Sequence, residues 1–167
     1  MNKIIPKSES KLTLIASSGD MFGIQLVEKL GYNDMAAIIN ISKDLSDIFG
    51  NNYLLTENNI HKYFNHNTLP FIATFNKKII GYIIGVPLEY FDNHSWAQYD
   101  TNLGKNNTIY TYAFLVNKNY RKKGGYAKTL KKIYLNWAKK RKFQFVTGHV
   151  SEEIINSFNS KTEIIKK

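Results

Sequence analysis

The chain has 167 residues, of which 43% are hydrophobic and 22% are charged, as in a folded globular protein and unlike a disordered one. It contains no cysteine, which excludes a disulfide framework, a thiolate metal site and a cysteine nucleophile. Lys and Arg number 23 against 13 Asp and Glu, which gives a net charge of +10.

The N-terminal part mixes Lys, Ser and Glu into its apolar residues and lacks the continuous apolar stretch of a secretory signal. No run in the chain approaches the roughly 20 apolar residues that span a bilayer. We therefore expect a cytoplasmic protein with one domain over residues 1–167. Residues 1–20 read as a loose leader, in which residues 11–16 could form a short strand.

The first half of the chain then predicts a strand and two helices. Alternation at Ile24 and Leu26 predicts a strand over residues 22–30. Asn33 or Asp34 can cap a helix that runs to residue 49, where apolar residues recur at near-helical spacing. Thr56 opens a second, shorter predicted helix to residue 64.

Residues 71–75 and 79–86 read as a β-hairpin joined by the polar turn Asn76-Lys-Lys. A long polar loop follows over residues 89–107, and loops of this length in a compact domain are often functional. Its candidate polar residues are Glu89, Asp92, His94 and Asp100, which either line a substrate site or are solvated loop residues.

The second half predicts the remaining elements of a mixed α/β (α+β) fold, a sheet with helices packed against it. They are a strand over 108–116, an amphipathic helix over 125–141, a strand over 143–150, a short helix over 152–158 and a last strand over 162–165. Tyr110 and Tyr112 in the first of these strands could donate hydrogen bonds, although we expect one of them to be core.

The turn between the strand ending at Val116 and the long helix is basic and rich in glycine. Residues 117–167 carry 14 basic and 3 acidic residues, so this last third is expected to meet an anion: a phosphorylated cofactor, a nucleic acid or an acidic surface. Small residues let a backbone approach a ligand closely, and the unpaired N–H groups and dipole of a helix N-terminus favour phosphate. The turn is neither a Walker A loop nor a dinucleotide-binding fingerprint.

In this turn the sequence resembles the Gcn5-related N-acetyltransferase (GNAT) superfamily. The superfamily's acetyl-CoA signature is Gln/Arg-x-x-Gly-x-Gly/Ala, and residues 122–127, Lys-Lys-Gly-Gly-Tyr-Ala, match it with Lys in the first place. The order of predicted elements over residues 22–165 is also that of the superfamily. The resemblance implies the GNAT fold, a central, mostly antiparallel mixed sheet flanked by helices.

The resemblance also implies acetyl-CoA as cosubstrate, bound in a V-shaped gap between the strands over 108–116 and 143–150. Backbone groups of the first of these strands would pair with the pantetheine arm, and the following loop would hold the pyrophosphate. The implied cofactor-binding residues are Leu115, Val116, Arg121, Lys122, Lys123, Gly124, Gly125, Tyr126 and Ala127. The acetyl group would pass directly to a primary amine, without a covalent enzyme intermediate.

The usual catalytic residues of the superfamily are missing. Many members carry a Glu in the strand before the loop, whereas residues 108–116 contain no carboxylate. Many also carry a Tyr that protonates the leaving thiolate, and Phe158 stands in its place and cannot donate a proton. His149 is the catalytic candidate, because its ordinary pKa suits proton transfer near neutrality; alternatively it is a structural residue at a strand end.

The C-terminus departs from the superfamily too, because its usual final pair of strands is incomplete after residue 165. The segment near residues 11–16, or a partner subunit, would have to replace the last strand. An unpaired edge there would favour a homodimer. The four histidines, His61, His66, His94 and His149, show no metal-ligand spacing, so we predict no metal.

Three hypotheses therefore stand. The first is an acetyltransferase that acetylates an amine of unidentified nature, either a small molecule or a protein, with no membrane partner. The second is a catalytically weak domain that binds CoA as a sensor or interaction module, which the missing Tyr and Glu motivate. The third is a basic nucleic-acid-binding protein, which the positive last third motivates but no recognised RNA-binding motif supports.

Overall fold

The computed structural model describes residues 8–122, 124–155 and 162–165. In this part of the chain the strands form one sheet in the order β1-β2-β3-β4-β5-β6. The strands are β1 (Lys11–Ser18), β2 (Phe22–Lys29), β3 (Leu69–Phe75), β4 (Lys78–Pro87), β5 (Thr108–Val116) and β6 (Phe145–Gly148). Neighbouring strands are antiparallel except β5 and β6, which pair in parallel. The predicted class, a mostly antiparallel mixed α/β fold, is confirmed.

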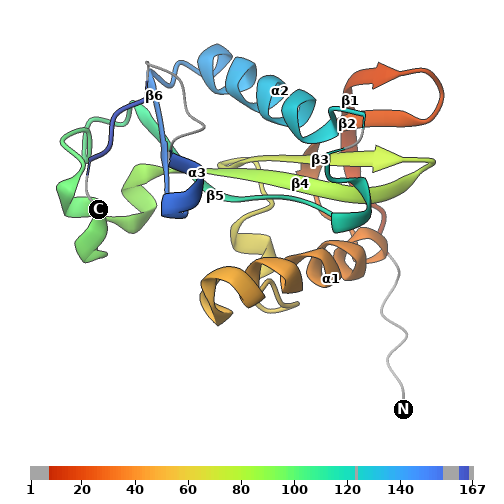
Figure 1. Ribbon diagram of the computed structural model, residues 1–167, viewed down its shortest axis with the longest axis horizontal. Helices are drawn as coiled ribbons and strands as arrows, with labels where there is room; N and C mark the ends of the chain where they lie inside the picture. The colour runs from red at the N-terminus through yellow and green to blue at the C-terminus, as the bar shows by residue number, and fades with distance from the viewer. Residues whose placement is uncertain (1–7, 123, 156–161, 166–167) are drawn as a thin grey trace.

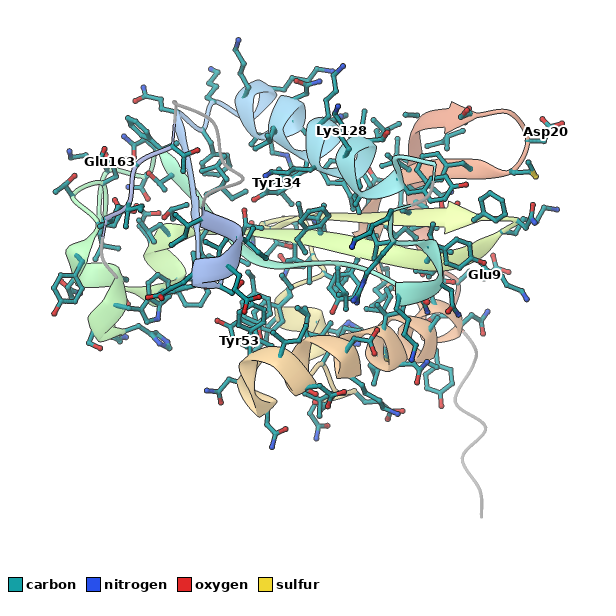
Figure 2. All side chains as sticks on the ribbon, viewed as in Figure 1. Glu9, Asp20, Tyr53, Lys128, Tyr134 and Glu163 are labelled. Carbon is teal, nitrogen blue, oxygen red and sulfur yellow. The ribbon has the colours of Figure 1, made fainter. Side chains whose placement is uncertain are left out.

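One helix covers each face of the sheet, as Figure 1 shows. Helix α1 (Tyr32–Phe49) buries Ile38, Ile41 and Leu45 against one face, and α2 (Tyr126–Lys140) buries Leu130 and Tyr134 against the other. In Figure 2 the Tyr134 ring lies between α2 and the sheet. The core therefore consists of two apolar layers separated by the sheet, and a third, four-residue helix, α3 (Glu152–Ile155), follows β6.

The predicted hairpin over residues 71–86 is confirmed as β3 and β4. Its two turn residues, Asn76 and Lys77, have φ of 47° and 64°, which is the left-handed pair that a two-residue hairpin turn requires. The segment near residues 11–16 is also a strand, β1, so this part of the expected leader belongs to the sheet. It pairs with β2 at the edge opposite β6, and therefore does not replace a final strand beside β6.

The helix predicted over residues 56–64 is wrong, because only the short 3-10 turn Ile60–Lys62 forms there. Asparagine side chains bind the backbone groups that a helix would use. The side chain of Asn59 accepts from Thr56 N and donates to the Leu54 carbonyl, and that of Asn65 donates to the carbonyls of His61 and Lys62. Such local bonds compete with a regular helix.

The start of α1 and the predicted last strand also differ from expectation. Helix α1 begins at Tyr32, with Gly31 before it and no side-chain cap, rather than with a cap at Asn33 or Asp34. Residues 162–165 are not a strand, since none of the described residues forms a strand beyond β6 with which they could pair. No helix in the described ranges is long and apolar enough to cross a membrane.

Candidate functional site

Strands β5 and β6 run side by side and then separate. Their pairing extends from Thr108 opposite Phe145 to Thr111 opposite Gly148, where β6 ends, while β5 continues to Val116. At the same level β5 carries a bulge, because its pairing with β4 passes from Gly85↔Thr111 to Ile84↔Ala113 and leaves one residue extra. A bulge bends a strand and ends regular pairing, and the pairing of β5 with β6 ends at the same residue, where the resemblance places the expected gap.

Beyond the bulge, alternate backbone groups of β5 face this gap. A Cβ atom on Gly81 of β4 would lie 2.6 Å from the carbonyl oxygen of Leu115, so this carbonyl points toward β4 and away from the gap. The N–H of Asn117 bonds to the Ile80 carbonyl on β4. Since the bonds of an antiparallel pair alternate, the Val116 backbone groups between these two residues face the opposite side.

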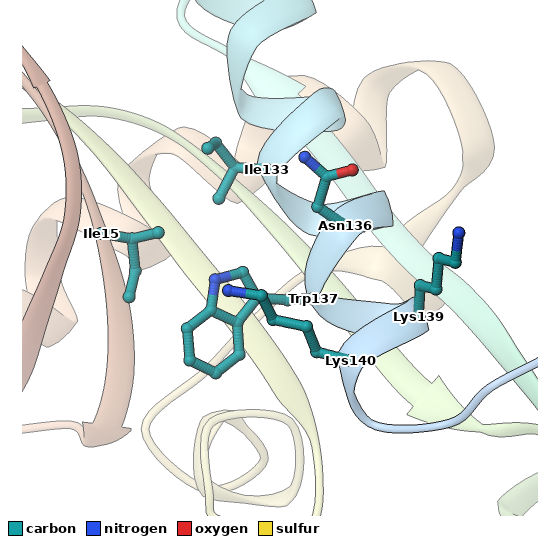
Figure 3. Close-up of a pocket in the computed structure, with 6 residues that line it drawn as sticks. All are labelled: Ile15, Ile133, Asn136, Trp137, Lys139 and Lys140. Carbon is teal, nitrogen blue, oxygen red and sulfur yellow. The ribbon is translucent and has the colours of Figure 1, made fainter.

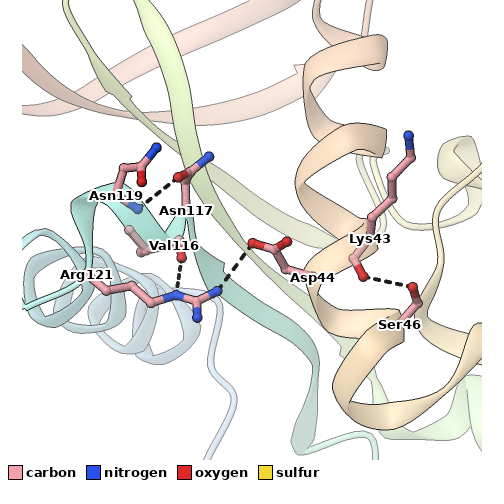
Figure 4. A network of polar contacts seen from close by, with 7 residues as sticks. All are labelled: Lys43, Asp44, Ser46, Val116, Asn117, Asn119 and Arg121. Atoms are coloured by element: carbon pink, nitrogen blue, oxygen red, sulfur yellow. Dashed lines mark hydrogen bonds and ion pairs between the residues drawn. The ribbon is translucent and has the colours of Figure 1, made fainter.

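The Val116 carbonyl is held by Arg121. The Arg121 Nε donates to the Val116 oxygen at 2.6 Å, and its terminal nitrogen lies 3.5 Å from the Asp44 carboxylate on α1 (Figure 4). The side chain of Asn117 accepts from Asn119 N and so fixes the start of the same loop. A basic side chain therefore stands at the mouth of the gap, bonded to the strand that lines it.

The loop after Val116 has the backbone of a ligand cradle. Lys122, Gly124 and Gly125 all have positive φ, between 58° and 66°, which suits glycine. Gly125 precedes α2 without a side-chain cap, and the first N–H groups of the helix have no acceptor within it. A Cβ atom on Gly125 would meet nothing within 4 Å. The space beside Gly125 is thus open, whereas a Cβ atom on Gly124 would lie 2.5 Å from the Tyr126 ring. Lys123 lies outside the described residues.

The start of α2 is anchored by aromatic stacking. The Tyr126 ring lies 4.7 Å from Phe22 and 5.7 Å from Phe75, measured between ring centroids. A shallow hollow of about 350 Å³ lies here between the β1–β2 hairpin and the helix, lined in part by Gly124 and Thr129. This packing fixes the helix N-terminus relative to the sheet.

A second hollow, of about 500 Å³, lies farther along α2 (Figure 3). It is lined by Ile15 of β1 and by Ile133, Trp137 and two lysines of α2, one of which, Lys140, lies over the Trp137 ring. Neither hollow is lined by Val116, Tyr110 or His149. The groups that could react therefore lie on another part of the surface, near the strand separation.

His149 lies just after β6, at the level where β5 and β6 separate. Its Nδ1 is 2.7 Å from the Tyr110 hydroxyl on β5. Burial lowers the pKa of His149 below its ordinary value of 6.5, so the ring is neutral at pH 7. Burial, aided by the nearby Tyr53 hydroxyl, raises the pKa of Tyr110, so the phenol stays protonated. The pair can accept or relay a proton without carrying charge at rest.

Aromatic rings surround this pair. We call Phe91, Trp96, Tyr110, Tyr112 and His149 the aromatic cluster. Its centroid distances are 4.7 Å for Trp96–Tyr110, 4.8 Å for Trp96–His149 and 4.9 Å for Phe91–Tyr110. Both tyrosines are buried, rather than one, because they lie two residues apart on β5 and share a face. The Tyr112 hydroxyl donates to the Asn52 carbonyl.

Two of the candidate loop carboxylates bind the loop itself. One oxygen of Glu89 accepts from Gly104 N and Asn106 N, and Asp100 accepts from Asn102 N. Asp92 and His94 are exposed. The carboxylates of Glu89 and Asp100 thus hold the shape of the loop that carries Phe91 and Trp96.

Sequence reasoning found the loop and His149 but missed two features. The contact between Arg121 and Asp44 joins residues 77 positions apart, and no local pattern indicates it. The aromatic cluster joins the loop over 89–107, β5 and the residue after β6. Its only signal in the sequence is the frequency of Tyr, Phe and Trp. Phe158, expected in place of a catalytic Tyr, lies outside the described residues.

The sequence matches the acetyltransferase (GNAT) family over residues 38–154. This range includes α1 from Ile38 onward, the paired part of β5 and β6, the glycine-containing loop, α2 and His149. No match was found among curated protein sequences.

Solved acetyltransferases share the fold. An aminoglycoside acetyltransferase, meta-AAC0020, from an uncultured soil sample is 17% identical, with a TM-score of 0.60 over 87% of this chain and 92% of that one. Aminoglycoside N-acetyltransferase AAC(6')-Iy in complex with CoA is 14% identical, with a TM-score of 0.60 over 86% of each chain. A GNAT family acetyltransferase of Staphylococcus aureus is 20% identical, with a TM-score of 0.57 over 88% of this chain and 98% of that one.

Proposed function

The chain belongs to the acetyltransferase (GNAT) family, and from this premise we propose that it transfers the acetyl group of acetyl-CoA directly to a primary amine. Acetyl-CoA is the cosubstrate of this family, and solved structures of the same fold are complexes with CoA and with a bisubstrate analogue of CoA. The observation that carries the proposal is the uncapped, basic, left-handed turn at Gly125, which opens α2 beside the end of β5.

The proposal assigns the cofactor-binding residues to the loop before α2 and to the end of β5. In this proposal the backbone from Lys122 to Ala127, including Lys123, Gly124 and Tyr126, holds the pyrophosphate at the α2 N-terminus. Val116 offers its backbone to the pantetheine arm, whereas the Leu115 carbonyl is directed at β4. Arg121 releases the Val116 carbonyl when the arm arrives and adds its charge to the phosphate site.

His149 supplies the base. With hydrogen on Nδ1 donated to the Tyr110 oxygen, Nε2 is free to take a proton from the acceptor amine. The amine nitrogen attacks the thioester carbonyl, a C–N bond forms and the C–S bond breaks. The amine proton passes to His149 and the departing thiolate takes a proton from solvent. Tyr110 acts as a positioning residue, because it orients the imidazole without touching the amine.

The test is amine-dependent release of free thiol by the full chain supplied with acetyl-CoA, with the acetylated amine identified by mass spectrometry. We expect thiol release that saturates in both substrates and an acetamide product. Saturable acetyl-CoA binding without turnover of any primary amine would instead show a CoA-binding module. Absence of acetyl-CoA binding by the folded chain would overturn both the acetyltransferase and the CoA-binding module.

A further inference from the structure

The aromatic cluster lies beside His149 and could hold the acceptor, an inference that rests on the proposed function. We propose that the acceptor is a small primary amine carried on an aromatic or similarly flat apolar group, bound against Trp96 with its nitrogen at His149. An acceptor without a flat apolar group, such as an aminoglycoside, would lack the contact that this surface offers.

The geometry of the rings supports a flat acceptor. Trp96 is half-buried and meets His149 edge to face, at an interplanar angle of 82°. The Phe91 ring lies 5.2 Å from that of Trp96, measured between centroids. An aromatic ligand gains both apolar burial and offset or edge-to-face contacts on such a surface. An ammonium group near the same faces also gains from the ring quadrupoles before it loses its proton.

The cluster lies where the reaction must occur. Tyr110 and His149 flank the last paired residues of β5 and β6, and the gap opens immediately beyond them. The thioester at the end of the pantetheine arm would reach this level from the cradle at Gly125. Trp96 touches both Tyr110 and His149, so a ring bound on Trp96 holds its amine close to the base.

The experiment compares five amine acceptors, and it compares substitutions at the chain's two tryptophans. Acetylation of 2-phenylethylamine, tryptamine, n-butylamine, spermidine and sisomicin is measured with the full chain at saturating acetyl-CoA. Trp96→Ala is set beside Trp137→Ala, since both side chains are half-buried but Trp137 packs on α2 against Phe71, far from the cluster. Acetyl-CoA binding by each protein is measured separately by calorimetry.

We expect kcat/KM for the two ring-bearing amines to exceed that for n-butylamine and the polycations by about tenfold or more, the size of a good aromatic contact. Trp96→Ala should raise KM for the ring-bearing amines by about tenfold with unchanged acetyl-CoA affinity, and Trp137→Ala should not.

Equal or faster turnover of spermidine or sisomicin would overturn the inference and leave the proposed function intact. So would acetyl-CoA binding without acetylation of either ring-bearing amine. If the wild-type chain does not bind acetyl-CoA at all, the proposed function itself is wrong.

Discussion

The hydrogen bond between Tyr110 and His149 engages the imidazole at Nδ1, at 2.7 Å. In the proposed reaction Nδ1 donates to the phenol oxygen, and Nε2 is the nitrogen that takes the proton of the amine. Burial lowers the pKa of His149, which costs the ring some basicity but keeps it in the neutral, proton-accepting form at pH 7. For a base, that form is the active one.

The sign of the pH dependence follows. The contribution of His149 to kcat/KM should be constant above pH 6.5, its ordinary pKa, and should decline below it as the ring becomes protonated. We expect His149→Asn to reduce the rate by about a hundredfold at pH 7.5, the scale of general-base catalysis. The ratio of wild-type to variant rates cancels the ionisation of the amine itself and isolates this effect.

His61→Asn is the matched control, because this histidine is exposed on the short turn after α1. Its pH profile should superimpose on that of the wild-type protein. A ratio for His149→Asn that does not change between pH 5.5 and 8.5 would show that His149 is a structural residue at the strand end.

At the scale of elements, α2 would connect stability to cofactor binding, because its N-terminus is the proposed phosphate cradle. Leu130 and Leu135 lie on the same helix, one fully buried under the sheet and the other 39% exposed. Leu130→Ala should lower the free energy of unfolding by about 3 kcal/mol, through lost burial and the cavity left behind. Leu135→Ala should cost less than about 1 kcal/mol. Urea unfolding of the two variants measures the difference, and equal losses would contradict the packing of α2 described above.

The sequence was sufficient for elements with a strong local signal. The hairpin with Asn76 and Lys77 at its turn, the two long helices and the strand before the glycine-containing loop were all predicted from periodicity and turn residues. The turn over residues 56–64 was not, because its asparagines satisfy backbone groups that a period-based prediction assigns to a helix. Local polar competition of this kind is invisible to hydrophobic spacing.

The site could be predicted only where it is local. The glycines of the cradle and the basic residues beside them are contiguous, and a motif finds them. The aromatic cluster instead depends on strand register: the bulge in β5 and the parallel pairing with β6 decide that Tyr110 meets His149. No hairpin turn fixes the register of β5 and β6, because the two strands are parallel and α2 lies between them in the chain. Spacing in the sequence therefore could not indicate which rings would meet.

At the scale of the whole molecule, charge and function agree. The excess positive charge lies in residues 117–167, which contain the cradle and α2. This field should attract the polyanionic CoA moiety and be screened by salt over about 10 Å at 0.1 M ionic strength. We therefore expect the Kd for acetyl-CoA to rise several-fold between 0.05 and 0.5 M NaCl, in contrast to the KM for a singly charged ring-bearing amine.

Titrations by calorimetry in the two salts test this expectation, with KM for 2-phenylethylamine measured in parallel. A Kd for acetyl-CoA that is independent of salt would show that the basic last third serves some other partner.

The most direct test of the account is a calorimetric titration of the full chain with acetyl-CoA, using two aspartate variants. Gly125→Asp and Gly19→Asp each place a carboxylate at a left-handed position, with φ of 66° and 59° and open space around the new side chain. They impose comparable backbone strain, but only Gly125 lies at the cradle. We predict saturable binding of acetyl-CoA by the wild-type protein and by Gly19→Asp, and at least about a tenfold loss of affinity in Gly125→Asp from repulsion between the carboxylate and the phosphates. Undiminished binding by a folded Gly125→Asp protein would contradict the central claim that this turn holds the cofactor.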